Sequence, residues 1–255
     1  MNLIKEIFDY PFLIRTLNKI LNDNDKFYLF CCSKYFYQKK FKFDFSESIT
    51  SITITNIENI NSKKVTPFTT HLNLKFYSEV ELPKIPFGPK FLTFSGHFNS
   101  FIESVIPNSI THLTFGSKFN KSIQNSIPPS VTHLTFDFDF NQTIIGNIPT
   151  SVTHLRIENN AVCFHKPAEE LRDTSNRYHS KFDQRIDNLH EGLLVLKLSW
   201  SYTRKINNLP STLQKLTISK KCYEINKDVI PIDTKLFHDY HSTTSCGRVG
   251  CRYNK

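Results

Sequence analysis

Glycine is scarce in this chain, with only 7 copies in 255 residues, and no long apolar run is present that could form a membrane-spanning helix. So few glycines leave little material for the loops that cradle phosphate groups. The short motifs of common hydrolases, metalloproteases, P-loop proteins and dinucleotide-binding folds are also missing. These absences argue against an enzyme, a cofactor and a small-molecule substrate.

Features of a secreted protein are missing as well. The 6 cysteines follow no regular spacing and suggest no disulfide framework. Lys5, Glu6 and Asp9 interrupt the apolar residues at the N-terminus, where a signal peptide would need a continuous apolar stretch. We therefore expect a cytoplasmic protein in a reducing compartment, without a membrane partner.

The chain has an excess of positive charge, with a net charge of +9 and a pI near 9.2. Such a balance raises nucleic acid as a partner. The basic residues are dispersed, however, and cluster only in pairs such as Lys63-Lys64 and Lys220-Lys221. No nucleic-acid-binding module is recognisable, so the charge supports at most a weak, salt-sensitive attraction to acidic partners.

What the chain does have is a repeated decapeptide. It reads IPNSITHLTF from Ile106, IPPSVTHLTF from Ile127 and IPTSVTHLRI from Ile148, at a spacing of 21 residues. A fixed period of this size is typical of solenoids, in which each unit buries its apolar side against its neighbours. Phe-Asn pairs recur between the copies in the same register, at Phe98, Phe119 and Phe140.

The repeat extends beyond these three copies. Apolar anchor residues recur at steps of 20 or 21, with one step of 41, at Ile52, Leu72, Leu92, Leu113, Leu134, Leu155, Leu196 and Leu216. The residue two positions further on is apolar each time, which predicts a short strand with one buried face. A ninth, imperfect unit is expected after Pro231.

The L-x-x-L-x-L core resembles a leucine-rich repeat, and Phe-Asn followed by Ile-Pro at this spacing closely resembles the FNIP repeat family of social amoebae and giant viruses. The resemblance implies an α+β protein in three parts. A short N-terminal helical module spans residues 1–44, and a leucine-rich-repeat-like β-solenoid of about eight or nine units of 20–21 residues spans 45–235. Residues 236–255 form a C-terminal tail.

Residues 1–44 do not follow the repeat, and their apolar residues recur at helical spacing. They resemble a degenerate F-box, through the stretch Leu17–Leu21 and the ending CCSKYFY at Cys31–Tyr37. If so, the residues that would dock the adaptor of a cullin-RING ubiquitin ligase are Pro11, Leu17, Ile20, Leu21, Leu29 and Tyr35. A plain helical cap that seals the end of the solenoid is the alternative.

The long step after Leu155 predicts an insertion near residues 158–188. Its charged sequence is compatible with a helix, with Pro167 suited to the first position and Gly192 to the end. Three interpretations remain open: a recognition element, a tolerated surface loop, or a repeat that lost its strand.

Histidines precede the anchor leucines in successive units, so stacked strands should align them in a column. We interpret the column mainly as part of the repeat, because a straight line of imidazoles does not converge on a metal ion. With their neighbours on the strands these residues form the candidate target-binding face: His112, Thr114, His133, Thr135, His154, Arg156 and Lys197.

The tail offers one weak candidate metal site. Its ligands would be His238, His241, Cys246 and Cys251, residue types that zinc prefers. A frayed tail after the last repeat is the alternative, and we predict no bound metal.

Together these features predict a protein that binds other proteins. The two resemblances imply a substrate receptor of a cullin-RING ubiquitin ligase, with the helical module on the adaptor and the solenoid on an unknown target. The alternative is a plain repeat scaffold with a helical cap and no link to ubiquitin.

Overall fold

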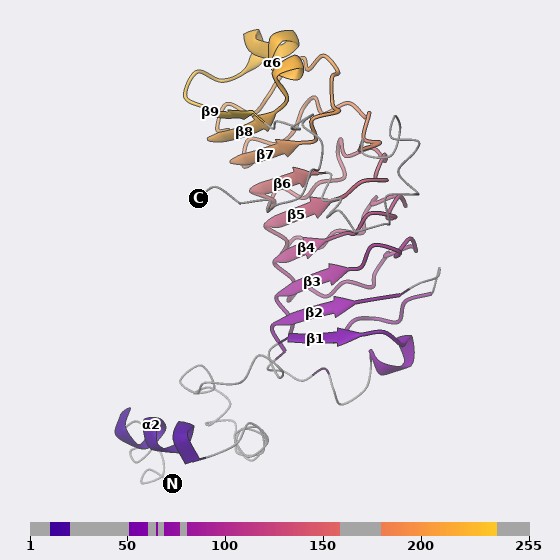
Figure 1. Ribbon diagram of the computed structural model, residues 1–255, viewed down its shortest axis with the longest axis vertical. Coiled ribbons are helices and arrows are strands. Elements are labelled where there is room, and N and C mark those ends of the chain that lie inside the picture. Colours follow the sequence, from indigo (N-terminus) through magenta and orange to yellow (C-terminus); the bar gives the residue numbers. More distant parts are fainter. Residues whose placement is uncertain are drawn as a thin grey trace, which may run out of the picture.

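The computed structural model describes residues 11–20, 51–60, 65, 69–76, 81–158 and 180–238. Its central feature is a single sheet of nine parallel strands that follow one another in sequence order (Figure 1). The strands are β1 (Ser51–Ile54), β2 (His71–Leu74), β3 (Phe91–Phe94), β4 (His112–Thr114), β5 (His133–Phe136), β6 (His154–Ile157), β7 (Val195–Leu198), β8 (Lys215–Ile218) and β9 (Lys235–His238). One strand per repeat unit makes the chain a parallel β-solenoid.

The register of the sheet follows the expected anchors. Ile52 pairs with Leu72, and the pairing continues anchor to anchor as far as Leu196 with Leu216. Leu216 then pairs with Leu236 of β9, so the ninth unit expected after Pro231 is present. The predicted solenoid is confirmed, since period-2 burial within each strand and the 20–21-residue period together leave little choice of register.

Phenylalanine fills the core in two stacked columns. Phe94 and Phe136 end their strands and Phe115 directly follows β4, with successive ring centroids 5.2 and 5.3 Å apart. A second column stands beside the first and consists of Phe98, Phe119, Phe140, Phe182 and Tyr202, with centroids 5.8–6.1 Å apart. Every one of these rings is almost completely buried, so aromatic stacking continues from unit to unit.

A ladder of asparagine side chains supports the turn beside the second column. The Asn99 side-chain oxygen accepts from the backbone N–H of Asn120 at 2.9 Å, and that of Asn120 accepts from Asn141 N–H at 2.8 Å. Each bond joins residues 21 positions apart. These bonds join the turns of neighbouring units at the surface.

The chain resumes the repeat earlier than the sequence predicts. The Lys181 N–H donates to the Phe138 carbonyl, and Phe182 enters the second aromatic column directly after Phe140. Residues 180–188, which we expected within the insertion, therefore lie in the solenoid register. The surplus chain is confined to residues 159–179, which lie outside the described residues.

Helices are few among the described residues. Helix α2 (Pro11–Ile20) falls where the sequence predicts the first helix of the N-terminal module, while residues 21–50 lie outside the description. The short 3-10 helix η2 (Ile57–Asn59) follows β1. Helix α6 (Lys220–Asn226) begins after Ser219, whose hydroxyl accepts from Cys222 N–H at 3.2 Å, and leads into the 3-10 helix η4 (Lys227–Val229).

Candidate protein-binding face

The first and third residues of each strand point away from the core and form the outer face of the sheet, while the second and fourth are buried in β2 to β8. The first positions, which we call the histidine row, are Ser51, His71, Phe91, His112, His133, His154, Val195, Lys215 and Lys235. The third positions, which we call the threonine row, are Thr53, Asn73, Thr93, Thr114, Thr135, Arg156, Lys197, Thr217 and Phe237. All seven residues expected on the target-binding face lie in these two rows.

The imidazoles of the histidine row are stacked. The ring centroids of His112 and His133 are 4.1 Å apart, as are those of His133 and His154, with interplanar angles of 14° and 13°. Phe91 continues the stack, at 4.4 Å from His112 and 4.2 Å from His71. Phe91 was not predicted for this face because it is not a histidine; its position directly before the anchor Leu92 was the available signal.

Threonines fix the orientation of these rings. The hydroxyls of Thr111, Thr132 and Thr153 each lie 2.9 Å from Nδ1 of the histidine that follows. Each hydroxyl also lies within donating distance of a carbonyl in the preceding unit, such as Thr132 on Thr111 O at 3.2 Å. The column is thus tied to the backbone ladder, which restricts its side-chain rotamers before any partner arrives.

The stacked arrangement disfavours protonation. Burial, the neighbouring His112 and His154, and Arg156 together lower the pKa of His133 to about 4. Burial also lowers the pKa values of His112 and His154, with the nearby positive groups adding to the effect. The column is therefore neutral at pH 7, and this part of the outer face is aromatic and uncharged.

Basic residues appear on the outer face from β6 onward, beside the last histidine of the column. Arg156 and Lys197 are paired neighbours in the threonine row, and both contact the carboxylate of Glu158, at 3.4 and 3.5 Å. Further along, Lys215 Nζ lies over the ring of Phe237, 4.4 Å from its centroid, and Lys235 is the register partner of Lys215. We call Arg156, Lys197, Lys215 and Lys235 the basic end of the outer face.

The remaining expected site residues are only partly described. Of the adaptor-docking set, Pro11, Leu17 and Ile20 lie in α2, and Ile20 is 72% exposed. Leu21, Leu29 and Tyr35 lie outside the described residues. Of the expected zinc ligands, His238 ends β9 and packs edge-on against Tyr223 at 5.6 Å, while His241, Cys246 and Cys251 are outside the description.

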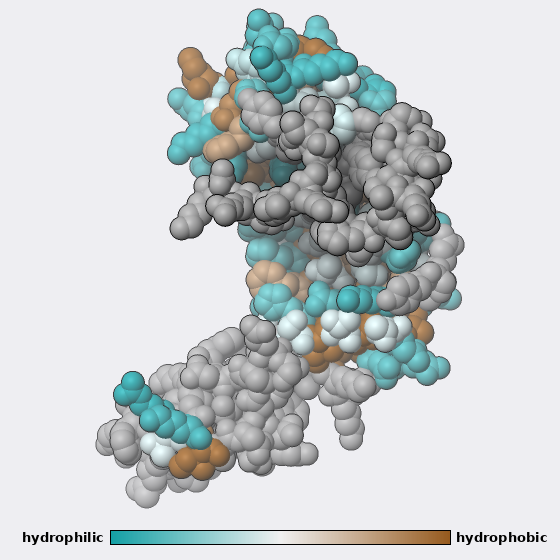
Figure 2. All heavy atoms as spheres, in the orientation of Figure 1, coloured by the Kyte–Doolittle hydropathy of each residue, from teal (hydrophilic) through white to brown (hydrophobic). Residues whose placement is uncertain are grey.

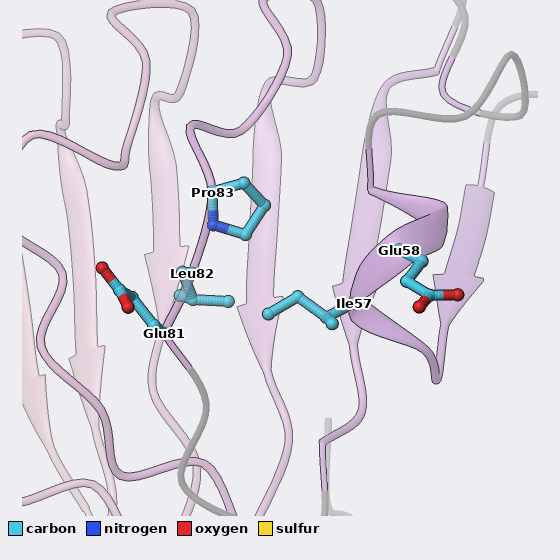
Figure 3. A pocket seen from close by; sticks show the side chains of 5 residues that line it. All are labelled: Ile57, Glu58, Glu81, Leu82 and Pro83. Atoms are coloured by element: carbon cyan, nitrogen blue, oxygen red, sulfur yellow. The ribbon is translucent and has the colours of Figure 1, made fainter.

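The part of the chain that the structure describes offers no cluster of three or more metal-ligating side chains. It does have an open hollow of about 400 Å³ between η2 and the segment before β3, lined by Ile57, Glu58, Glu81, Leu82 and Pro83 (Figure 3). The hollow is open to solvent, and its lining combines two carboxylates with three apolar side chains. Within the described ranges, no helix has the length and apolar character needed to cross a bilayer.

A single parallel sheet with one strand per unit, L-x-L burial and a stacked phenylalanine core defines a leucine-rich-repeat-like solenoid. The FNIP Repeat family model matches residues 83–118 and 119–160, so the chain contains FNIP repeats. The solved structure titled "The crystal structure of CroV588 a novel circular LRR protein structure" is similar, with 28% sequence identity and a TM-score of 0.53. The match covers 68% of this chain but 24% of that one.

This chain therefore spans about a quarter of the length of that circular protein. A comparison with curated proteins found no match. Repeat solenoids are scaffold folds that generally bind other proteins through their extended surfaces, and the fold places this chain in that class.

Proposed function

We propose that the outer face of the sheet holds a target protein, and that the chain is a substrate receptor of a cullin-RING ubiquitin ligase. The observation that carries target binding is the continuous outer face itself, whose two rows run in register across nine strands. Receptor function is supported by the F-box resemblance of residues 1–44. A cytoplasmic location belongs to the same proposal.

Pre-organisation supports the choice of this face. Thr132 fixes the ring of His133 on one row, and Glu158 holds the long side chains of Arg156 and Lys197 on the other. A partner that binds here freezes fewer side-chain rotamers than on an ordinary surface, so less binding free energy is lost to ordering. The sheet also presents these groups at the regular strand spacing of about 4.8 Å.

The proposed mechanism is proximity. The helical module would dock the adaptor while the solenoid holds the target, which raises the effective concentration of target lysines near the ubiquitin-loaded enzyme. The chain performs no chemistry itself in this scheme. Pro11, Leu17 and Ile20 are the candidates for adaptor contact that lie in α2, and the exposed side chain of Ile20 suits such a role.

Binding of the purified full-length chain to the ligase adaptor tests the receptor role. We expect capture of the adaptor, and we expect Ile20→Glu to abolish it. Ile232→Glu is the matched control, because Ile232 is a 97% exposed apolar residue in the solenoid and should leave adaptor binding intact.

A wild-type chain that does not bind the adaptor would exclude the ligase role and leave the plain scaffold. The scaffold makes its own prediction, since a cap seals the first unit. Deletion of residues 1–44 should then destabilise the solenoid toward urea, whereas loss of a separate docking module should leave its stability nearly unchanged.

A further inference from the structure

The outer face is divided by charge into two halves. Within the described strands β1 to β5, no outward first or third position holds a lysine, arginine, aspartate or glutamate. From β6 onward the two rows hold the four basic side chains of the basic end and no acidic one. The boundary falls between Thr135 and Arg156, which are register partners on neighbouring strands.

Glu158 compensates only part of this charge. The Glu158 side chain is 6% exposed, directly follows β6 and contacts both Arg156 and Lys197. Its single negative charge therefore balances one of their two positive charges. Lys215 and Lys235 lie further along the histidine row, and the ring of Phe237 beneath Lys215 offers 46% of its surface to solvent. Figure 2 shows largely hydrophilic side chains at this α6-bearing end, with scattered apolar ones among them.

We infer that the outer face binds an extended acidic segment of the target, with carboxylates against the basic end and a neutral stretch along strands β1 to β5. This inference rests on the proposed function, since it names the class of target that the same face would hold. Guanidinium and ammonium groups pair with carboxylates, and complementary charge selects both partner and orientation. The segment would therefore run across the strands with a fixed direction.

A protein segment fits this face better than a nucleic acid. A nucleic acid carries one phosphate per nucleotide along its whole length, so it needs basic contacts throughout. Strands β1 to β5 offer no lysine or arginine on this face. The flat faces of the stacked rings are covered by the neighbouring rings of the column, so they are not open to a nucleic-acid base. A polypeptide can place acidic residues at one end and neutral residues at the other, as the face requires.

The test is binding of a fluorescent synthetic peptide to the full-length chain, measured by anisotropy at low salt. The peptide has a glutamate-rich half and a half rich in threonine and tyrosine. Three reference probes accompany it: the same peptide with glutamine in place of glutamate, the peptide with its two halves exchanged, and a single-stranded DNA oligonucleotide. We expect the acidic peptide to bind more tightly than each of the three.

Two variants move the affinity in opposite directions. R156Q/K197Q should weaken acidic-peptide binding roughly tenfold, since it removes two partly exposed charges. E158Q should strengthen it severalfold, because it releases the same two side chains from their carboxylate. The matched control K205Q/K227Q removes two exposed charges outside the sheet and should change affinity less than twofold, because salt screens exposed charges that do not contact the peptide.

Several results would overturn the inference. Equal weakening by R156Q/K197Q and K205Q/K227Q would mean that net charge alone attracts the peptide. Tighter binding of DNA than of the peptide would assign the face to nucleic acid, and absence of peptide binding would reject an acidic target. Adaptor capture is measured separately, so a chain that binds the adaptor but not the peptide refutes this inference and leaves the receptor role standing.

Discussion

The backbone N–H of Asp183 donates to the side-chain oxygen of Asn141 at 2.9 Å, across 42 residues of sequence. The corresponding bond from Asn141 N–H to Asn120 spans 21 residues. The asparagine ladder therefore connects the units on either side of residues 159–179 directly. Because the ladder skips one whole repeat length, residues 159–179 amount to one additional unit in length that adds no strand between β6 and β7.

Deletion of residues 159–179 should leave the solenoid intact. The Glu158 N–H donates to the Phe136 carbonyl, and the Lys181 N–H donates to the Phe138 carbonyl. These bonds place Glu158 and Ser180 opposite the consecutive residues Asp137 and Phe138 of the preceding unit. The two ends can therefore be joined directly when residues 159–179 are removed. We expect a change in the free energy of unfolding of about 1 kcal/mol or less, since loop length affects stability only logarithmically. Urea denaturation followed by circular dichroism measures it.

The control is deletion of residues 180–189, which removes Phe182 from the aromatic column and shifts the following unit out of register. That variant should lose cooperative unfolding. If the first deletion behaves like the second, the register assigned to residues 180–188 is wrong.

Four units have a residue in the left-handed conformation at the equivalent position: Ser104 (φ 57°), Asn125 (φ 53°), Gly146 (φ 72°) and Asn188 (φ 59°). A side chain at Gly146 would meet no atom within 4 Å, so its substitution tests backbone strain alone. We expect Gly146→Ala to destabilise the chain by about 1 kcal/mol and Gly146→Asn by clearly less, because asparagine tolerates this conformation. Equal urea midpoints for the two variants would contradict the explanation.

Gly116 is required for a different reason, which is close packing between units. A Cβ atom there would lie 2.5 Å from the carbonyl carbon and oxygen of Ser95 and 2.7 Å from Gly96 N, all backbone atoms that cannot move aside. We expect Gly116→Ala to cost about 3 kcal/mol of unfolding free energy. Gly96→Ala is the matched control, since its Cβ would meet only the Ser117 hydroxyl at 3.2 Å, and thermal unfolding should rank the two clearly.

The stacked histidines should make the free energy of unfolding depend on pH. The folded pKa of His133 is lowered from 6.5 to about 4, so below pH 6.5 the unfolded chain binds more protons than the folded one. Its stabilising effect is complete above pH 6.5 and is lost progressively as the pH falls to about 4. His133→Gln should therefore lose less stability than the wild type between pH 7 and pH 5.

Urea midpoints at these two pH values measure the difference. His97→Gln serves as the control, because it also replaces one histidine by glutamine, but at an exposed position outside the sheet. Identical responses of His133→Gln and the wild type would show that the column does not resist protonation.

The sequence alone was sufficient to predict the strands, because alternating apolar residues recur at a constant period in every unit. The sequence did not reveal units that keep the backbone geometry of the repeat but have other residues in place of the Phe-Asn pair. Phe182-Asp183 and Tyr202-Thr203 replace the Phe-Asn pair, which hid the return of the repeat after residue 179. The two contacts of Glu158 could not be anticipated either, since Lys197 is its neighbour only once the surplus chain is looped out.

A column of stacked imidazoles is a one-dimensional lattice of titratable sites. Each interior ring has two close neighbours, so a proton on one ring opposes a proton on the next. Burial and the charges of His112, His154 and Arg156 lower the pKa of His133, the middle ring, to about 4. Simultaneous positive charge on neighbouring rings is therefore disfavoured along the column, most of all at the ring with a histidine on either side.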